Sequence, residues 1–122
     1  MRVNVVGLCG AGKSSLVRRL RCAGCDAHEI AQEHSGVPDL WRRLRSPEAL
    51  VFLDASLETI WRRRPGTLLT PVLYGDLQSR LAHARAHAGL VVATDDLTEE
   101  AVAGIVRAHL TCLLGKDIIT RA

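Results

Sequence analysis

The chain has 122 residues, of which 48% are hydrophobic and 24% are charged, which is the length and composition of one globular domain. A chain of this size buries roughly two-thirds of the surface that its unfolded form exposes, enough for one hydrophobic core. The composition excludes a disordered tail, a collagen-like chain and a small disulfide framework. No apolar run approaches the roughly 20 residues that cross a bilayer, so we expect no membrane partner.

The formal net charge of +3 is mild. The chain has only four aromatic residues, too few for a surface on which bases stack, and its arginines are dispersed over several predicted helices, so we expect no nucleic-acid partner. Met1 and Arg2 lead directly into a strand-like run with no signal peptide before it, which predicts a soluble, cytoplasmic protein. Disulfides between the four cysteines are therefore not expected.

The spacing of apolar residues predicts strands that alternate with helices. The predicted strands cover residues 2–7, 27–31, 49–54 and 90–93. The predicted helices cover residues 13–23, 38–44, 56–64 and 74–88, with a loop over 65–72, and a last helix is capped by Asp96 and ended by Gly115. Short strands joined by helices pair in parallel, with helices on both faces. We therefore expect a single α/β domain over residues 1–122, with three layers and about four parallel strands.

The most informative motif is Gly7-Leu8-Cys9-Gly10-Ala11-Gly12-Lys13-Ser14, which fits G-x-x-x-x-G-K-[ST] and lies between the first predicted strand and the first predicted helix. Its glycines let backbone amides approach phosphate oxygens, and the helix N-terminus adds unpaired amides and the positive end of its dipole. Lys13 is expected to contact the terminal phosphates, and Ser14 to offer its hydroxyl to Mg²⁺. The residues predicted to bind a nucleoside triphosphate are Gly7, Gly10, Ala11, Gly12, Lys13, Ser14 and Ser15.

The spacing Gly-x-x-Gly-x-Gly-Lys-Ser-Ser resembles the phosphate loop of small-molecule kinases, the P-loop NTPases that include shikimate kinase, gluconate kinase and the nucleoside-monophosphate kinases. Residues 51–58 are similar to the passage after which those kinases form a helix leading into an arginine-bearing lid. Residues 90–95 are similar to the last strand of shikimate kinases. The resemblance implies a P-loop NTPase fold, ATP and Mg²⁺ as cofactors, and phosphate transfer to a small molecule. The choice of ATP over GTP comes from this resemblance alone.

The chain departs from these kinases between Ala27 and Pro47. Shikimate kinases carry an acidic pair after their second strand and a glycine pair after their third, and this chain shows neither. The segment that would hold the phosphate acceptor is missing or shortened, which argues against shikimate as the acceptor. Two functions stay open: a minimal kinase-like phosphotransferase or ATPase, and a non-catalytic nucleotide-binding or regulatory module. The basic, apolar-flanked middle of the chain also allows a homodimer.

A magnesium-dependent site needs a carboxylate at the carboxyl end of a strand beside the phosphate loop. Asp54 ends the apolar strand ALVFLD and is a candidate metal ligand together with Ser14, although the resemblance implies that this aspartate is structural, a helix cap. Glu33 follows the second predicted strand, and we favour it for the chemistry: it can orient a water, bind Mg²⁺ through water or act as a base. The alternative for Glu33 is a solvated loop carboxylate.

Arg62, Arg63 and Arg64 stand just before a Pro-Gly loop. One of them, with Arg63 as our candidate, is expected to neutralise charge on the transferred phosphoryl group, next to the catalytic Lys13 and Glu33. The alternative is a solvated basic helix end that complements the helix dipole. The resemblance makes Arg80 the nearest match to an acceptor-binding arginine, and the alternative there is a polar outer helix face.

Overall fold

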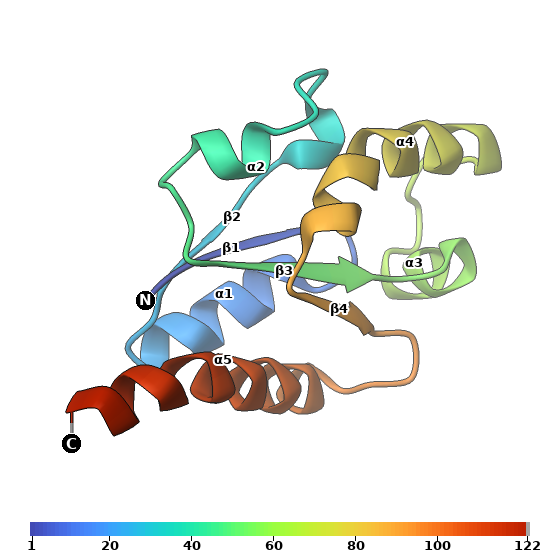
Figure 1. Cartoon of the computed structure of the whole chain (residues 1–122). Coiled ribbons are helices and arrows are strands. Elements are labelled where there is room, and N and C mark those ends of the chain that lie inside the picture. Colours follow the sequence, from blue (N-terminus) through green and yellow to red (C-terminus); the bar gives the residue numbers. More distant parts are fainter. Residues whose placement is uncertain (122) are drawn as a thin grey trace.

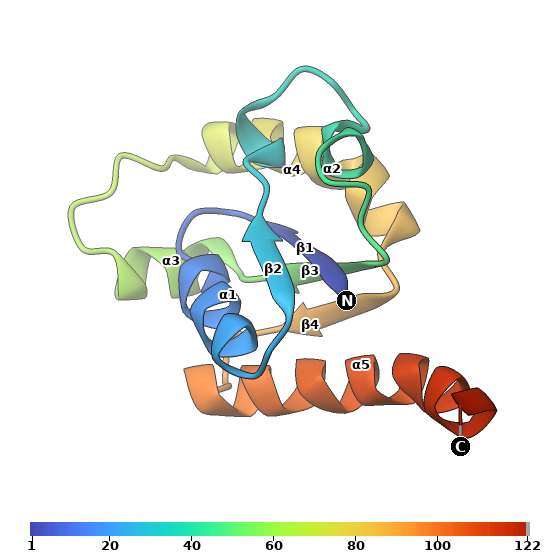
Figure 2. The same cartoon turned by 90° about the vertical axis from the view of Figure 1, so that its left-hand side faces the viewer.

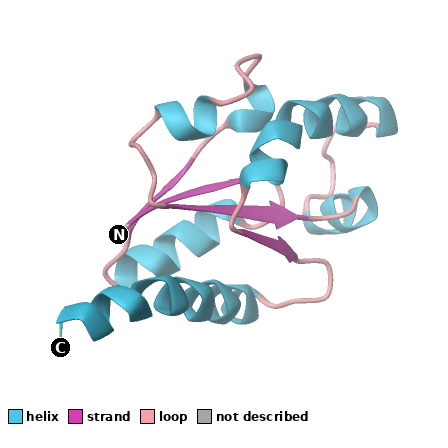
Figure 3. Cartoon of the chain, in the orientation of Figure 1, coloured by secondary structure: helices cyan, strands magenta, loops and turns pink. Residues whose placement is uncertain are grey.

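Strands and helices alternate along the chain, as the apolar pattern predicts (Figures 1 and 3). The structure is a computed structural model that describes the backbone of residues 1–121 and the side chains of residues 1–114. The elements are β1 (Arg2–Gly7), α1 (Lys13–Cys22), β2 (Asp26–Glu29), the 3-10 helix η1 (Gln32–His34), α2 (Leu40–Arg43), β3 (Ala49–Asp54), α3 (Leu57–Arg63), α4 (Pro71–His87), β4 (Leu90–Ala93) and α5 (Glu99–Arg121).

Within residues 1–121 the strands form one parallel sheet of four strands, in the order β2-β1-β3-β4. Val3 of β1 pairs with Ala27 on one side and with Ala49 on the other. The central strands β1 and β3 are apolar and buried, and Val3, Val5 and Val51 are fully inaccessible to solvent. Continuous apolar runs of this kind are typical of parallel strands covered on both faces. The predicted α/β class and parallel pairing are confirmed.

Helices lie on both faces of the sheet. Figure 2 shows α1 and α5 on one face, and α2 and α4 on the other. α1 buries Leu16 and Leu20 against the sheet and leaves Arg18 exposed. α4 buries Leu77 and Leu81 on its inner face. This arrangement is compatible with the expected three layers, in which each helix buries one apolar stripe against the sheet.

Two predicted helices have boundaries that are wrong by three residues or more, and the helix predicted over residues 38–44 is shorter, Leu40–Arg43. α4 begins at Pro71 rather than near Tyr74, because the Thr70 hydroxyl caps it and proline suits the first helical position. α5 is capped by Thr98, whose hydroxyl accepts the Ala101 amide at 3.0 Å, and not by Asp96. It also runs past Gly115 to Arg121, since a single glycine costs a helix only about 1 kcal/mol. No helix within residues 1–121 is both long and apolar enough to span a membrane.

The topology opens a crevice beyond the carboxyl ends of the central strands. β1 continues through α1 to β2 on one side, whereas β3 continues through α3 and α4 to β4 on the other. In open parallel sheets, ligands bind where neighbouring strands send their connections in opposite directions, and here that point lies between β1 and β3. The segment Gly7–Ser14, called the glycine loop below, follows β1 at this point.

Candidate functional site

The glycine loop turns sharply because its three glycines, Gly7, Gly10 and Gly12, adopt a positive φ that other residues resist. Gly7 has a φ of +148° and lies so close to β3 that a Cβ atom would come within 2.4 Å of the Leu53 carbonyl oxygen. Gly12 precedes α1 with a left-handed φ of 103°, and no side chain of residues 1–114 caps this helix. The first amides of any α-helix have no intrahelical acceptor. Because no side chain caps α1, these amides stay available to an anion at the helix N-terminus. The amide of Ala11 is already used, since it donates to the Leu8 carbonyl at 3.0 Å.

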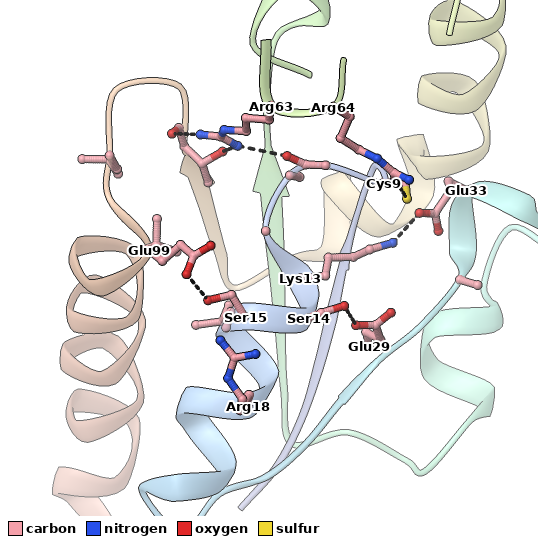
Figure 4. Close-up of a pocket in the computed structure, with 18 of the residues that line it drawn as sticks. Cys9, Lys13, Ser14, Ser15, Arg18, Glu29, Glu33, Arg63, Arg64 and Glu99 are labelled. Atoms are coloured by element: carbon pink, nitrogen blue, oxygen red, sulfur yellow. Dashed lines mark hydrogen bonds and ion pairs between the residues drawn. The ribbon is translucent and has the colours of Figure 1, made fainter. Parts of the chain in front are cut away.

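A cavity of about 720 Å³ lies over the glycine loop (Figure 4). Residues 9–15 of the loop and of α1 form one wall of it. The other lining residues come from the rest of α1, from β2 and η1, from the end of α3, from the turn after β4 and from α5: Leu16, Arg18, Glu29, Ala31, Glu33, His34, Arg63, Arg64, Thr94, Leu97, Glu99 and Val102. The fold thus brings Lys13, Glu33 and Arg63, the predicted catalytic residues, to one cavity.

Lys13 and Glu33 form a buried ion pair in this cavity (Figure 4). Their side chains are only 9% and 2% exposed. The Lys13 ammonium donates to Glu33 Oε2, whereas Glu33 Oε1 is buried and has no hydrogen-bond partner among the described side chains and backbone. Glu33 is therefore not the solvated loop carboxylate that the sequence left as an alternative. A buried carboxylate with an unpaired oxygen is costly, and the ion pair with Lys13 offsets part of that cost.

The backbone around Glu33 is fixed by its neighbour Gln32, which is fully buried. Gln32 Oε1 accepts the Trp41 amide at 2.9 Å, and Gln32 Nε2 donates to the Val37 carbonyl at 2.7 Å. Arg80 of α4 donates to the Glu33 carbonyl at 3.3 Å. These bonds tie η1 to α2 and α4, so the Glu33 side chain is held facing the glycine loop. Arg80 thus contacts the backbone of the site and does not line the cavity itself.

Glu29, at the end of β2, is a site residue that the sequence analysis does not identify. Its Oε2 accepts the Ser14 hydroxyl at 2.7 Å, and it lines the cavity beside Glu33. A signal is present in the sequence, because Glu29 stands at the carboxyl end of the strand next to β1. The predicted strand runs on to Ala31, so the prediction places Glu29 inside the strand and not at its carboxyl end.

Asp54 lies at the end of β3 but outside the lining of the cavity. Its side chain pairs with Arg85 of α4 at 3.1 Å. The structure therefore does not bring Asp54 together with Ser14, the other predicted metal ligand. The carboxylate that accompanies Ser14 is Glu29.

The arginines at the end of α3 have different surroundings. Arg63 donates to the Gly10 carbonyl at 3.1 Å, to the Thr94 hydroxyl at 3.1 Å and to the Thr94 carbonyl at 2.5 Å. It therefore joins the glycine loop to the end of β4. Arg64 extends over the loop, where its guanidinium contacts Cys9 Sγ (Figure 4). Within residues 1–114 the Arg64 guanidinium is not anchored to backbone carbonyls as that of Arg63 is, so its charge is the freer of the two.

The turn after β4 holds α3 in place. The Asp95 carboxylate accepts the Ser56 amide at 2.8 Å at the start of α3. A hydrogen bond from the Thr59 hydroxyl, followed by that from the Ser56 amide, lowers the pKa of Asp95 below its ordinary value of 3.8. The ionised form of Asp95 is consequently the form that keeps α3, and with it Arg63 and Arg64, beside the cavity.

Ser15 faces the other side of the cavity. Its hydroxyl donates to Glu99 of α5 at 2.8 Å, and Glu99 also pairs with Arg19 at 3.7 Å. The Glu99 side chain is 62% exposed, so solvent screens its charge far more than that of Glu33. Three glutamates, Glu29, Glu33 and Glu99, therefore hold the three polar side chains Ser14, Lys13 and Ser15.

Comparison with known proteins identifies no family for this chain. No protein-family model matches the chain, and no curated protein is significantly similar to it.

Proposed function

We propose that this protein is a P-loop NTPase that binds Mg·ATP over the glycine loop and acts as a minimal kinase-like phosphotransferase or as an ATPase. The observation that carries the proposal is the combination at one helix N-terminus of a glycine-bounded turn, uncapped amides and a lysine that reaches into a 720 Å³ cavity. Such an arrangement gives a polyphosphate several donors that need little reorganisation. ATP rather than GTP is proposed from the resemblance to small-molecule kinases.

The oxygen donors beside the loop fit Mg²⁺. A hydroxyl from Ser14 and carboxylates from Glu29 and Glu33 are hard ligands, and Oε1 of Glu33 has no hydrogen-bond partner among the described residues. Within the described residues, no three His, Cys, Asp or Glu side chains form a complete metal site. This fits Mg²⁺, which takes one or two carboxylates and is completed by substrate phosphates and water. When bound, the ion neutralises charge on the phosphates.

The residues around the cavity have separate roles in this proposal. Lys13 leaves Glu33 and contacts the terminal phosphates, which frees the Glu33 carboxylate to orient a water or an acceptor hydroxyl as a base. Arg64 supplies positive charge to the γ-phosphate, because its guanidinium has the freer charge at the end of α3. Arg63 holds the glycine loop beside the end of β4 through its hydrogen bonds to the Gly10 and Thr94 carbonyls, which is a positioning role.

A non-catalytic nucleotide-binding module is the second candidate, and one observation favours it. Between β2 and β3 the chain forms only η1 and the four-residue helix α2, so it builds no separate lobe for a phosphate acceptor there. Without such a lobe, a module of this kind binds nucleotide and passes its binding state to a partner.

Calorimetric titration with ATP and GTP in the presence of Mg²⁺, followed by a γ-phosphate release assay, tests the proposal. We expect micromolar to submillimolar binding that Lys13→Ala weakens by at least about tenfold, since a phosphate-contacting charge is lost. Ser14→Ala is expected to weaken binding only when Mg²⁺ is present. Ser79→Ala, at an exposed serine of α4, is the matched control and is expected to have no effect.

Binding with turnover that Lys13→Ala abolishes supports the enzyme. Binding without turnover in the wild-type protein supports the module. If neither nucleotide binds the wild-type protein, the proposed function is wrong.

A further inference from the structure

We propose that residues 61–75, called the α3–α4 tip below, form a peripheral docking surface for an anionic lipid bilayer. The tip covers the end of α3, the connection that follows and the start of α4. The inference goes beyond the proposed function, because the apolar side chains of the tip lie outside the cavity over the glycine loop and need no bound nucleotide. A peripheral surface lies on a bilayer and does not cross it, so it also needs no membrane-spanning helix.

The α3–α4 tip gathers exposed apolar side chains in one segment. Nine large apolar side chains are exposed within residues 1–114, and four of them belong to the tip: Trp61, Leu68, Val72 and Leu73. Leu68 is 89% exposed and Val72 is 76% exposed, the highest values of the nine. Scattered apolar residues on a surface need no partner, whereas a group of them in one place is typical of an interaction site.

Two hydrogen bonds give the tip a defined shape. Trp61 Nε1 donates to the Leu69 carbonyl at 2.7 Å, which ties the connection back to α3. The Leu73 amide donates to the Thr70 hydroxyl at 3.1 Å, which caps the start of α4. Leu69 packs against the core, and its neighbour Leu68 is left in solvent. Figure 2 shows the connection between α3 and α4 extending away from the sheet, so the exposed side chains belong to a projecting part of the molecule.

The same segment is basic. Residues 59–75 contain Arg62, Arg63 and Arg64 and no Asp or Glu. None of the three arginines forms an ion pair with a carboxylate of residues 1–114. Arg62 donates to the Asp95 carbonyl at 3.4 Å and Arg63 to the Thr94 carbonyl at 2.5 Å, and these neutral acceptors leave the charges in place. The tip therefore combines apolar side chains with positive charge, which is the combination that binds anionic membrane surfaces.

Two arguments favour a bilayer over a protein partner. A second copy of the chain that docked through the same surface would bring two basic tips together, and their like charges oppose that contact. A protein partner would need an acidic groove shaped to the projecting tip, whereas a bilayer accommodates apolar side chains of any arrangement between its headgroups. Trp61 also suits a position at headgroup level, because its indole N–H is already bonded and its ring is partly exposed.

Co-sedimentation of the whole chain with phosphatidylcholine vesicles, with and without phosphatidylserine, tests the inference in the absence of nucleotide. The test variants are Leu68→Ser combined with Val72→Ser, which removes apolar surface, and Arg62→Gln, which removes one charge. Ile105→Ser and Arg107→Gln are the matched controls, because both residues are exposed on α5. A thermal melt checks that each variant folds.

We expect wild-type protein to bind vesicles that contain phosphatidylserine at least about tenfold more strongly than phosphatidylcholine alone, and to dissociate at high salt. The variant with serine at positions 68 and 72 should bind about tenfold more weakly, because its side chains no longer bury apolar surface between the headgroups. Arg62→Gln should bind about fivefold more weakly, since one basic side chain near an anionic surface is lost. Ile105→Ser and Arg107→Gln should change binding by no more than about twofold, because α5 is not part of the tip and distant charges are screened.

Wild-type protein that sediments with neither kind of vesicle overturns the inference, as does equal binding to both kinds. A loss of binding that is as large for Ile105→Ser as for the variant at positions 68 and 72 also overturns it, because the tip would then not be the contact. Sedimentation velocity of the protein alone adds a further test. A dimer that the substitutions at positions 68 and 72 dissociate would identify the tip as a contact between copies of the chain and refute the bilayer as its occupant. Each of these outcomes leaves the proposed function intact, because no nucleotide is present.

Discussion

Replacement of Gly7 by alanine is expected to destabilise the protein strongly, through a clash with backbone. A Cβ atom at Gly7 would lie 2.4 Å from the Leu53 carbonyl oxygen, a distance that real Cβ atoms essentially never show. Leu53 belongs to β3, which is paired with β1 on one side and β4 on the other, so its carbonyl has little freedom to move. Strain at a positive φ costs about 1–3 kcal/mol, and overpacking costs about as much again. The expected loss in free energy of unfolding is therefore about 2–6 kcal/mol.

Urea denaturation followed by circular dichroism measures this loss, and Gly24→Ala provides the control. Gly24 also has a positive φ, +91°, but no atom of the described residues would lie within 4 Å of a Cβ atom added there. Gly24→Ala therefore loses only the free energy of the backbone conformation, about 1–2 kcal/mol. If the two variants lose the same free energy, the approach of β3 is not what requires glycine at position 7, and the reasoning is refuted.

Three further predictions concern contacts around the cavity. Gln32→Ala should lower the free energy of unfolding by about 2–4 kcal/mol, because the buried amide of Trp41 loses its acceptor. Chemical denaturation measures this loss, and a value below about 1 kcal/mol would contradict the role given to Gln32. Asp95 has a lowered pKa, so its stabilising effect is present at neutral pH and is lost as the pH falls through the folded-state value below 3.8; Asp95→Asn should be less stable than wild type at pH 7, with a difference that vanishes in acid. Arg64→Ala should reduce phosphate release with unchanged stability, whereas Arg63→Ala should lower the melting temperature; the opposite pattern would exchange their roles.

Much of the fold can be predicted from the sequence because local signals and tertiary packing agree. The apolar run of β3 has no polar alternation, which a strand tolerates only when both faces are covered. Ser56 stands three residues before Thr59, whose amide it caps at 3.2 Å, and the predicted start of α3 is therefore confirmed. The early start of α4 is harder to predict although Thr70-Pro71 is a local signal, because proline is as typical of a loop as of a first helical turn.

The site is harder to predict, because most of its contacts join residues that are distant in sequence. The place of Glu33 after a strand identifies it as a candidate, but its pairing with Lys13 and its burial depend on Gln32, which binds the Trp41 backbone across nine residues. The partner of Asp54, Arg85, lies on α4, and no local pattern predicts which face of the sheet that aspartate takes. Similarly, the sequence alone does not distinguish Arg63 from Arg64. Their roles differ because the fold places Arg63 against the Thr94 carbonyl after β4 and Arg64 against Cys9 of the glycine loop.

The buried pair of Lys13 and Glu33 links binding to stability, and a pair of variants separates the two. Lys13→Met alone leaves the Glu33 carboxylate buried without a partner, which typically costs about 3–5 kcal/mol. Lys13→Met combined with Glu33→Gln leaves neither charge behind, and replacement of both members of a buried pair is often close to neutral. We therefore expect the double variant to recover most of the lost free energy of unfolding but none of the ATP binding, as measured by urea denaturation and calorimetry of the same samples. Equal stability of the single and double variants would mean that the Glu33 carboxylate is hydrated once Lys13 is gone, and that the pair is not the electrostatic centre of this site.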